Sequence, residues 1–323
     1  MPGRRRPDAR RVGFLTDRNV IEPRDLFGYG SKPPHPRWPG NARVAVSFVL
    51  NFEEGAEFSI ADGDDRNEAV YEVIDRLHAL PDPCIRSHFD YGTRAGWWRI
   101  LEVLDRFNAR CTVSACGLAV QRSPHLAQDA LRRGHEVAAH GWRWESHAGM
   151  SLEQEREAIQ RTVKAIGDAT GVRPVGWHTR SAPSPNTRRL LMEDGGFLYD
   201  SDFYGDDLPR TIPAGSRRYV VLPYAFDTND MQFQHADRFA RAADFSGYVI
   251  DAFEWLWREG ETQPKMMSIG LHLRMLGRPA RMWALEQILE HFCSKKQVWI
   301  ARRDEIARHW LKVVADANDS AAS

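Results

Sequence analysis

Four apolar stretches of this sequence end in side chains that transfer protons or stabilise negative charge. Carboxylates act as general bases, imidazoles act as general acids, and arginine or histidine side chains stabilise an oxyanion. Together these groups supply what water needs to attack an amide carbonyl. Singly, a Glu-Glu pair is usually a solvated turn and a lone histidine a structural residue, so the prediction depends on the combination. The catalytic candidates are Glu53, Glu54, His140, Arg180 and His272.

Strands are expected to position these groups, because the stretches that carry them are β-rich and each is followed by helical periodicity. This alternation is typical of a parallel β/α fold, in which the carboxyl ends of the strands meet at one face. The sequence predicts an α/β fold, a distorted (β/α) barrel of about seven strands, which accounts for the alternation better than an open sheet does. The predicted strands are 43–53, 110–116, 136–140, 175–180, 219–224, 266–272 and 298–301.

The beginning of the chain differs from the rest in composition. Residues 1–42 are rich in Arg, Pro and Gly, and they predict an extended N-terminal arm without a core of its own, of the kind that often packs on a neighbour. Residues 43–323 predict a single catalytic domain with one large core. Within it, Ser151 and Gln154 form a candidate capping box. Glycines fall where helix C-terminal caps belong at Gly134, Gly171, Gly195 and Gly260.

Charge and composition limit the expected partners. Lys and Arg number 44 and Asp and Glu number 44, so no net field attracts nucleic acid or an anionic membrane, and a small-molecule substrate is expected. The basic N-terminus is not followed by an apolar run that would form a signal peptide or a membrane span, which favours a cytoplasmic protein. Four cysteines are too few for a disulfide scaffold.

The order of the motifs resembles that of the NodB-homology polysaccharide deacetylases. In that family the first motif, commonly TFDD, supplies a base and a metal-binding aspartate, and NFEE places Glu53 and Glu54 at these positions. The second motif is usually HxxxH, with two metal-binding histidines, whereas HGWRW has His140 followed by Trp144. The resemblance covers roughly residues 40–310 and implies a deacetylase-type barrel. The third motif's arginine and the last motif's histidine correspond to Arg180 in GWHTRSAPSPNT and His272 in SIGLHLRMLGRP.

Six longer blocks resemble a narrower group, the metal-independent allantoinases and cyclic imide hydrolases. This branch implies opening of a small cyclic amide ring without the metal that related deacetylases use to polarise the carbonyl. It also implies a homo-oligomer, a dimer or a tetramer, which the proline-rich arm favours as well. The blocks are GYGSKPPHPRWPGNARVAVSFVLNFEEG, DYGTRAGWWR, HGWRW, GGFLYDSDFYGDDLP, LPYAFDTNDMQF and GLHLRMLGRP.

The residue types at the motif positions argue against a catalytic metal. A zinc site needs about three good ligands and an open position, and the indole of Trp144 offers no lone pair. The extra methylene of Glu54 moves its carboxylate relative to that of an aspartate, which a rigid site tolerates poorly. No cofactor is therefore expected. If a divalent metal such as zinc binds, the candidate ligands are Glu54, His140 and His147, with Glu145 as a further carboxylate in the same loop.

Polar and aromatic residues near these motifs are candidates for substrate binding. His178 departs from the YTGR that the allantoinase branch usually has after GW, which concerns the identity of the substrate more than the reaction class. The run FDTNDMQF places Asp227, Asn229 and Asp230 either in the pocket or in an Asx turn. The run at 199–202, YDSD, either holds active-site loops together or caps strand ends. The substrate-binding candidates are Trp144, Trp177, Asp227 and Asn229.

The leading hypothesis is a hydrolase of non-peptide C–N bonds that opens a cyclic amide, ureide or imide without a required metal. Glu53 or Glu54 would activate water, His272 would protonate the leaving nitrogen, and Arg180 with His140 would hold the oxyanion. The alternative is a metal-dependent deacetylase of polysaccharides or N-acetyl sugars. A third interpretation is a non-catalytic, ligand-binding barrel.

Overall fold

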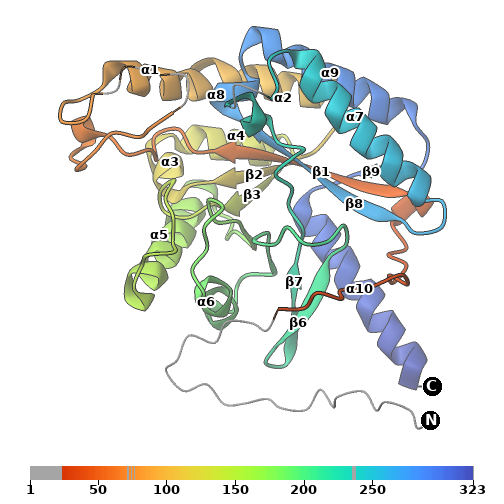
Figure 1. The fold of residues 1–323 in the computed structure, drawn as a ribbon. Helices are drawn as coiled ribbons and strands as arrows, with labels where there is room; N and C mark the ends of the chain where they lie inside the picture. The colour runs from red at the N-terminus through yellow and green to blue at the C-terminus, as the bar shows by residue number, and fades with distance from the viewer. Residues whose placement is uncertain (1–23, 71–72, 74, 76, 235–237, 323) are drawn as a thin grey trace.

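A curled sheet of nine strands forms the centre of the molecule (Figure 1). The computed structural model describes residues 24–322 apart from 71–72, 74, 76 and 235–237, and the strands are counted within these residues. Seven of them correspond to the predicted strands. The strands are β1 Val44–Phe52, β2 Thr112–Ala115, β3 Glu136–Ala139, β4 Gly176–Trp177, β5 Tyr199–Asp200, β6 Arg210–Ala214, β7 Arg217–Val221, β8 Lys265–His272 and β9 Val298–Ile300.

The strand order makes the sheet a half-barrel. The order is β6-β7-β5-β4-β3-β2-β1-β8, with β9 also paired to β1, and every pair is parallel except β6 with β7. Strands β7 and β8 are not paired with each other, which leaves the barrel open between them. The segment after β7 contacts β8 there through an isolated parallel bridge between Asn229 and Gly270. The predicted distorted barrel of about seven strands is confirmed in this curled form. The two strands that the sequence did not indicate are β5, which has only two residues, and β6, which shows no alternation of buried and exposed residues.

The central strand β1 pairs with β2 and β8 in a register that aligns the carboxyl ends of the three strands. All nine of its residues are buried, as expected for a parallel strand covered on both faces. Asn51 pairs with His272 of β8, and Phe52 pairs with Ala115 of β2. The carboxyl ends of β1, β2 and β8 therefore lie at the same edge of the sheet, and the residues that follow them begin the loops of that edge.

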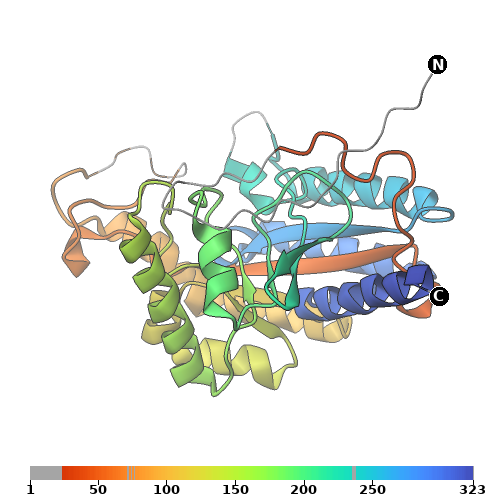
Figure 2. The ribbon, with the colours of Figure 1, turned by 90° about the horizontal axis from the view of Figure 1, so that it is seen from below.

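Helices cover the sheet on both sides. Figure 1 shows α7 and α9 side by side along one side of β1 and β8, with α10 on the other, and Figure 2 shows the sheet and α10 from below. Within the part of the chain that the structure describes, no helix is long and apolar enough to cross a membrane. The helices are α1 Pro83–Tyr91, α2 Trp97–Arg106, α3 Gly117–Arg122, α4 Pro124–Arg132, α5 Leu152–Thr170, α6 Thr187–Asp194, α7 Ala242–Glu259, α8 Leu273–Leu276, α9 Pro279–Ser294 and α10 Arg303–Ala322.

The predicted capping box and three of the four predicted cap glycines are present in the helices. Ser151 and Gln154 form the reciprocal capping box of α5. Gly260 follows α7 but has a φ of −63°, which any residue adopts. A Cβ added there would lie 2.4 Å from the carbonyl oxygen of Arg43, so this glycine allows a close contact and is not a left-handed cap. The other three predicted cap glycines do have positive φ: Gly134, Gly171 and Gly195, which follow α4, α5 and α6.

The described part of the N-terminal arm packs on the core of its own chain. Trp38 is 2% exposed, and its indole N–H donates to the carbonyl oxygen of Lys265 at 2.9 Å. Its ring centroid lies 5.8 Å from that of Trp299 and 6.1 Å from that of Trp310 in α10. Residues 1–23 of the predicted arm lie outside the described residues.

Replacing Trp38 by alanine tests this attachment. We expect the free energy of unfolding to fall by about 3–5 kcal/mol, because a large buried side chain is lost. Urea unfolding followed by circular dichroism measures the change. The matched control is Trp255→Ala: Trp255 is 58% exposed, and its loss should change the free energy by about 0.5 kcal/mol or less. Equal losses in the two variants would contradict an anchoring role for Trp38.

Candidate active site

Three strand ends bring Glu53, His140 and His272 together. Glu53 follows β1, His140 follows β3, and His272 ends β8. All three are buried, with at most 3% of each residue exposed. One carboxylate oxygen of Glu53, Oε1, lies 3.4 Å from Nε2 of His140 and 3.4 Å from Nε2 of His272. Two imidazoles from different strands therefore face the same oxygen atom.

Asp230 orients His272. Asp230 begins a short 3-10 helix, η4 Asp230–Gln234, and its carboxylate accepts from His272 Nδ1 at 2.6 Å and from the His272 amide at 2.8 Å. Burial disfavours a charge on His272, but the negative charges of Glu53 and Asp230 and the hydrogen bonds to both raise its pKa to about 9. At neutral pH the ring is an imidazolium that donates on both sides. This carboxylate–histidine pair gives the site a proton donor.

His140 is held by the backbone of the neighbouring strand. Its Nδ1 lies 2.6 Å from the carbonyl oxygen of His178, so Nδ1 carries the proton of this bond and Nε2 faces Glu53. The two imidazole rings are stacked, with centroids 5.1 Å apart. Burial, and after it the charge of His140, lower the pKa of His178 well below its usual value. His178 is thus a neutral ring that supports His140 from one side.

Arg274 is a functional candidate that the motif positions did not reveal. It lies in α8, two residues after His272, and its side chain is fully buried. Its Nη1 donates to Glu53 Oε2 at 2.7 Å and lies 3.5 Å from Glu54 Oε1. The available signal was a charged residue inside the otherwise apolar run that follows His272, since a charge buried in such a run requires a partner.

The two glutamates have different surroundings. Glu54 accepts from the amides of Glu53 and Arg274, each at 3.1 Å, and packs on Gly92 of a π-helix, η3 Gly92–Gly96, where an added Cβ would lie 2.4 Å from Glu54 Oε1. Burial raises the pKa of Glu54 to about 7, although Arg274 opposes the shift. Burial acts on Glu53 too, but His272, Arg274 and the histidine hydrogen bonds lower its pKa well below the usual value. Glu53 is therefore the carboxylate that stays ionised between the histidines.

Arg180 and Trp144 form a second layer beside this cluster. The guanidinium of Arg180 lies 3.4 Å from the centroid of the Trp144 ring and donates to the Trp144 carbonyl oxygen at 2.7 Å. Arg180 also pairs with Glu68 at 3.6 Å. The indole of Trp144 also contacts the cluster itself, because the guanidinium of Arg274 lies 4.8 Å from the centroid of the Trp144 ring. The structure thus directs Arg180 at Trp144 and not at Glu53.

The candidate metal ligands do not form a metal site. His147 is fully buried, and its Nδ1 lies 3.1 Å from Oε1 of Glu155, which also accepts from Ser184 and Thr187. Glu54 is bonded to two backbone amides and lies beside a guanidinium, which repels a second cation. Among the residues that the structure describes, no three His, Cys, Asp or Glu side chains are grouped so that they could hold an ion. The donor set of this chain therefore does not fit the metal of the second NodB motif.

The substrate-binding candidates fall in different places. Asn229 lies near the cluster: its amide nitrogen is 3.4 Å from Tyr224 Oη, which also accepts from Asn51 at 3.3 Å. Asn229 also makes the predicted Asx turn, with Oδ1 accepting from the Met231 amide at 2.9 Å. Asp227 accepts instead from Tyr248 and lines an outer cavity of about 640 Å³ beside α7.

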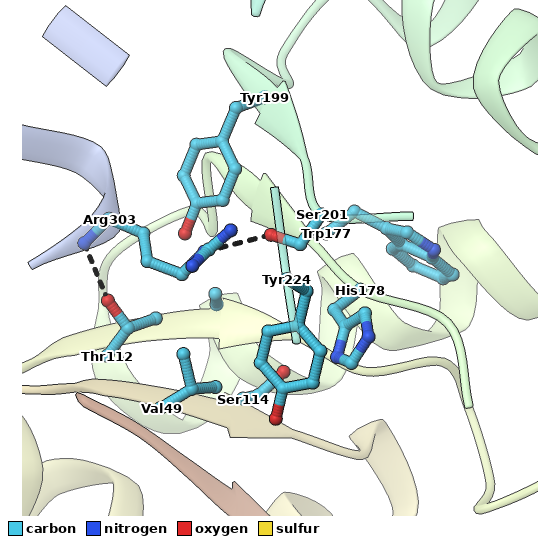
Figure 3. Close-up of a pocket in the computed structure, with 10 residues that line it drawn as sticks. Val49, Thr112, Ser114, Trp177, His178, Tyr199, Ser201, Tyr224 and Arg303 are labelled. Carbon is cyan, nitrogen blue, oxygen red and sulfur yellow. Dashed lines mark hydrogen bonds between the residues drawn. The ribbon is translucent and has the colours of Figure 1, made fainter. Parts of the chain in front are cut away.

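Trp177 lies in the interior of the barrel, apart from the cluster of Glu53, His140 and His272. It is fully buried, its indole N–H donates to Thr179 at 2.8 Å, and it lines an internal cavity of about 10 Å³, which holds about one water molecule (Figure 3). Figure 3 shows Tyr224 and His178 next to each other at this cavity and Arg303 reaching Ser201. The structure does not bring Trp177 to Glu53.

The aspartates of the YDSD run hold the loop that follows β4. Asp202 accepts from the Thr179 amide at 2.8 Å and from the Thr179 hydroxyl at 2.7 Å. Asp200 accepts from Arg188 of α6 at 2.8 Å. The Asp202 bonds hold Thr179 beside the residues that follow β5, and the Asp200 bond holds α6 to β5, as one of the two interpretations of this run predicted.

Comparison with known proteins identifies the family. A family model described as polysaccharide deacetylase matches residues 78–198. A putative polysaccharide deacetylase of Schizosaccharomyces pombe is 38% identical over 316 residues, which cover 90% of this chain and 98% of the relative. The chain belongs to the polysaccharide deacetylase family. The resemblance of its motifs to NodB-homology deacetylases is thereby confirmed, and the family consists of hydrolases that act on C–N bonds.

Solved structures of this deacetylase family share the whole barrel. A probable polysaccharide deacetylase from Pseudomonas aeruginosa PAO1 and a PuuE allantoinase are each 47% identical to this chain, with a TM-score of 0.86. In each case the match covers 90% of this chain and 98% of the solved one. The fold and the polysaccharide deacetylase assignment therefore rest on nearly the full length of both proteins.

Replacing Asp230 by asparagine tests the origin of the charge on His272. We expect the pKa of His272 to fall from about 9 toward its ordinary value of 6.5, because a negative charge that raises it is removed. In the wild type, the raised pKa contributes stability that is fully present below 6.5 and is lost as the pH rises through about 9. NMR titration of labelled histidine measures the change. Asp251→Asn, at an exposed position of α7, should leave the titration unchanged; an unchanged pKa in Asp230→Asn would refute the assignment.

Proposed function

We propose that this protein is a hydrolase that opens a cyclic amide, imide or ureide ring and does not require a metal. The observation that carries the proposal is the approach of Nε2 of two histidines to within 3.4 Å of one oxygen of the buried Glu53 carboxylate. Asp230 fixes one of these rings and the backbone of His178 fixes the other. Base, acid and oxyanion donor are therefore oriented before a substrate binds, which lowers the barrier to attack by water.

Glu53 is the general base in this mechanism. Its carboxylate takes a proton from water as the water oxygen attacks the carbonyl carbon of the ring. Glu54 has the pKa nearer to neutrality, about 7, which by itself would favour it as the base. Its oxygens are bonded to the amides of Glu53 and Arg274, however, and a base must first lie within reach of the proton. On this geometric ground we assign catalysis to Glu53 and backbone positioning to Glu54.

His272 is the general acid. Its imidazolium gives the Nε2 proton to the ring nitrogen as the C–N bond breaks. The acyl carbon becomes a carboxylic acid, which then returns a proton to the neutral His272, and the leaving nitrogen becomes an amide from an imide, a urea group from a ureide or an amine from a cyclic amide. His140, whose Nε2 faces the same point, is assigned to stabilising the oxyanion. Arg180 is assigned to substrate binding, because its guanidinium lies over Trp144 and its side chain is 32% exposed.

The chemistry of the site favours a small, activated carbonyl. Imides and ureides in rings are better electrophiles than ordinary acetamides, so they suit a site that activates water with a carboxylate alone. The similarity to a structure named PuuE allantoinase supports a substrate of this class. A second candidate is release of acetate from N-acetyl sugars, which the family membership favours; a peptidoglycan deacetylase of Helicobacter pylori is 24% identical over 72% of this chain.

A substrate screen with and without chelator tests the function. Cyclic ureides, cyclic imides and N-acetyl sugars are each incubated with untreated protein and with protein dialysed against EDTA. We expect ring opening of at least one cyclic compound, at the same rate in both preparations, because no step uses a metal. Release of acetate that stops with EDTA and returns with zinc or cobalt would support the deacetylase instead. No turnover in any arm would support a non-catalytic barrel.

The variant Glu53→Gln tests the base. Glutamine keeps the size of the side chain but takes up no proton, so we expect kcat to fall by roughly 100- to 10,000-fold, the range that general acid–base catalysis contributes. Steady-state kinetics on the best ring substrate measures the effect, and thermal unfolding checks the fold. Glu290→Gln, on the exposed side of α9, is the matched control and should keep wild-type kcat. A larger loss in Glu54→Gln than in Glu53→Gln would reverse the assignment of the two glutamates.

A further inference from the structure

Arg274 lies among the positions that would surround a metal in the related deacetylases. In the NodB motifs, the positions of Glu54, His140 and Trp144 carry ligands of the ion. The guanidinium of Arg274 contacts Glu54 at 3.5 Å, and its centre lies 4.8 Å from the centroid of the Trp144 ring. It also donates to Glu53 at 2.7 Å. A positive group that belongs to the chain itself thus lies beside the carboxylates that the first motif supplies.

We propose that Arg274 is a built-in cation that takes the place of a divalent metal: it balances the charges of Glu53 and Glu54, holds Glu53 toward the two histidines, and keeps metal ions out. A buried carboxylate requires a positive partner, and a guanidinium satisfies this need with directed hydrogen bonds. Arg274 is a positioning residue, because it acts through Glu53. Its effect on turnover rests on the proposed function, whereas its effect on metal binding does not.

The backbone around Arg274 is packed too closely for the side chain to leave easily. A Cβ added at Gly96 would lie 2.1 Å from the carbonyl oxygen of Leu273, and one added at Gly277 would lie 2.3 Å from Cα of Gly96. The amide of Arg274 is itself bonded to Glu54 at 3.1 Å. Helix α8 is therefore held against the π-helix η3, which fixes the backbone from which the Arg274 side chain reaches the two glutamates.

Trp144 complements this cation. The face of an aromatic ring attracts a guanidinium, and Arg274 lies 4.8 Å from the Trp144 ring and 4.5 Å from the Phe89 ring. An imidazole at position 144 would meet the same positive charge. A histidine at position 144 supplies a ligand, but Arg274 still occupies the space that an ion needs. Restoring a metal site therefore requires the replacement of both Trp144 and Arg274. Trp144 removes a ligand and Arg274 occupies the site.

Cobalt binding tests the exclusion of metal. Equilibrium dialysis with Co²⁺ compares the wild type, Trp144→His, and double variants that add Arg274→Met or Arg274→Lys to Trp144→His. Methionine and lysine are similar in length but differ in charge. We expect the Met double variant to bind about one equivalent of Co²⁺, the Lys double variant to bind about 30-fold more weakly, and the other two proteins to bind none.

Three results of this experiment overturn the proposal. The first is stoichiometric Co²⁺ binding by the wild type or by Trp144→His alone, because Arg274 is intact in both. The second is equal affinity of the Lys and Met double variants, because charge then has no effect. The third is the absence of binding in a folded Met double variant. The first result remains measurable even if the double variants do not fold.

Kinetics of the single variants Arg274→Met and Arg274→Lys tests the positioning of Glu53. We expect Arg274→Met to lower kcat about 100-fold with KM changed by less than about 3-fold, because substrate contacts remain, and Arg274→Lys to keep kcat within about 10-fold of the wild type. Circular dichroism checks that both fold. Wild-type kcat in Arg274→Met overturns the positioning role. If the wild type turns over no substrate, the proposed function has failed, whereas the cobalt result still decides for or against Arg274.

Discussion

The buried negative charge of Glu53 is the constraint on which the rest of the site depends. The residue is 1% exposed, and an ionised carboxylate taken out of water is strongly disfavoured unless charged or hydrogen-bonded partners surround it. Its partners here are Arg274, His140 and His272, which come from α8, the end of β3 and the end of β8. The charge is therefore stable only when segments far apart in the sequence have all reached their native positions, and the same contacts that stabilise it define the reactive geometry.

The opening in the barrel admits a chain segment that supplies a partner to the cluster formed by Glu53, His140 and His272. Because β7 and β8 are not adjacent strands in the sheet, the segment after β7 runs between them and is tied to β8 by the bridge from Asn229 to Gly270. That segment supplies Tyr224, which accepts from Asn51 at the end of β1, and Asp230, which orients His272. A fully closed barrel would place strand backbone there. The gap thus gives the site a carboxylate that raises the pKa of His272, and this in turn keeps the ring protonated beside Glu53.

The sequence was most informative where a candidate catalytic group directly follows a buried strand. Glu53 and His272 lie at the ends of long apolar runs, so the strand-end rule placed both at one edge of the sheet. The same rule was weaker for the predicted strand 175–180, since only Gly176–Trp177 is strand; Arg180 therefore lies in a loop over Trp144, and Trp177 lies in the interior. Arg274 was not predictable from local pattern, because its partner is 221 positions away and its helix has only four residues.

The proposed replacement of a metal by a guanidinium would restrict the chemistry that the barrel performs. A metal ion polarises a carbonyl and lowers the pKa of bound water to about 7, so that hydroxide is available to attack even an unactivated acetamide. The guanidinium of Arg274 does neither, because it contacts the carboxylates and offers no open coordination position. In the proposed mechanism, activation of water then falls to Glu53. The same partners that stabilise Glu53 lower its pKa, which makes it a weak base. Under the proposed mechanism, such a site would turn over only substrates whose carbonyl is already electrophilic and whose leaving nitrogen readily accepts a proton. The cation that stabilises the buried carboxylate is thus also a reason why we propose a strained ring, and not an N-acetyl group, as the substrate.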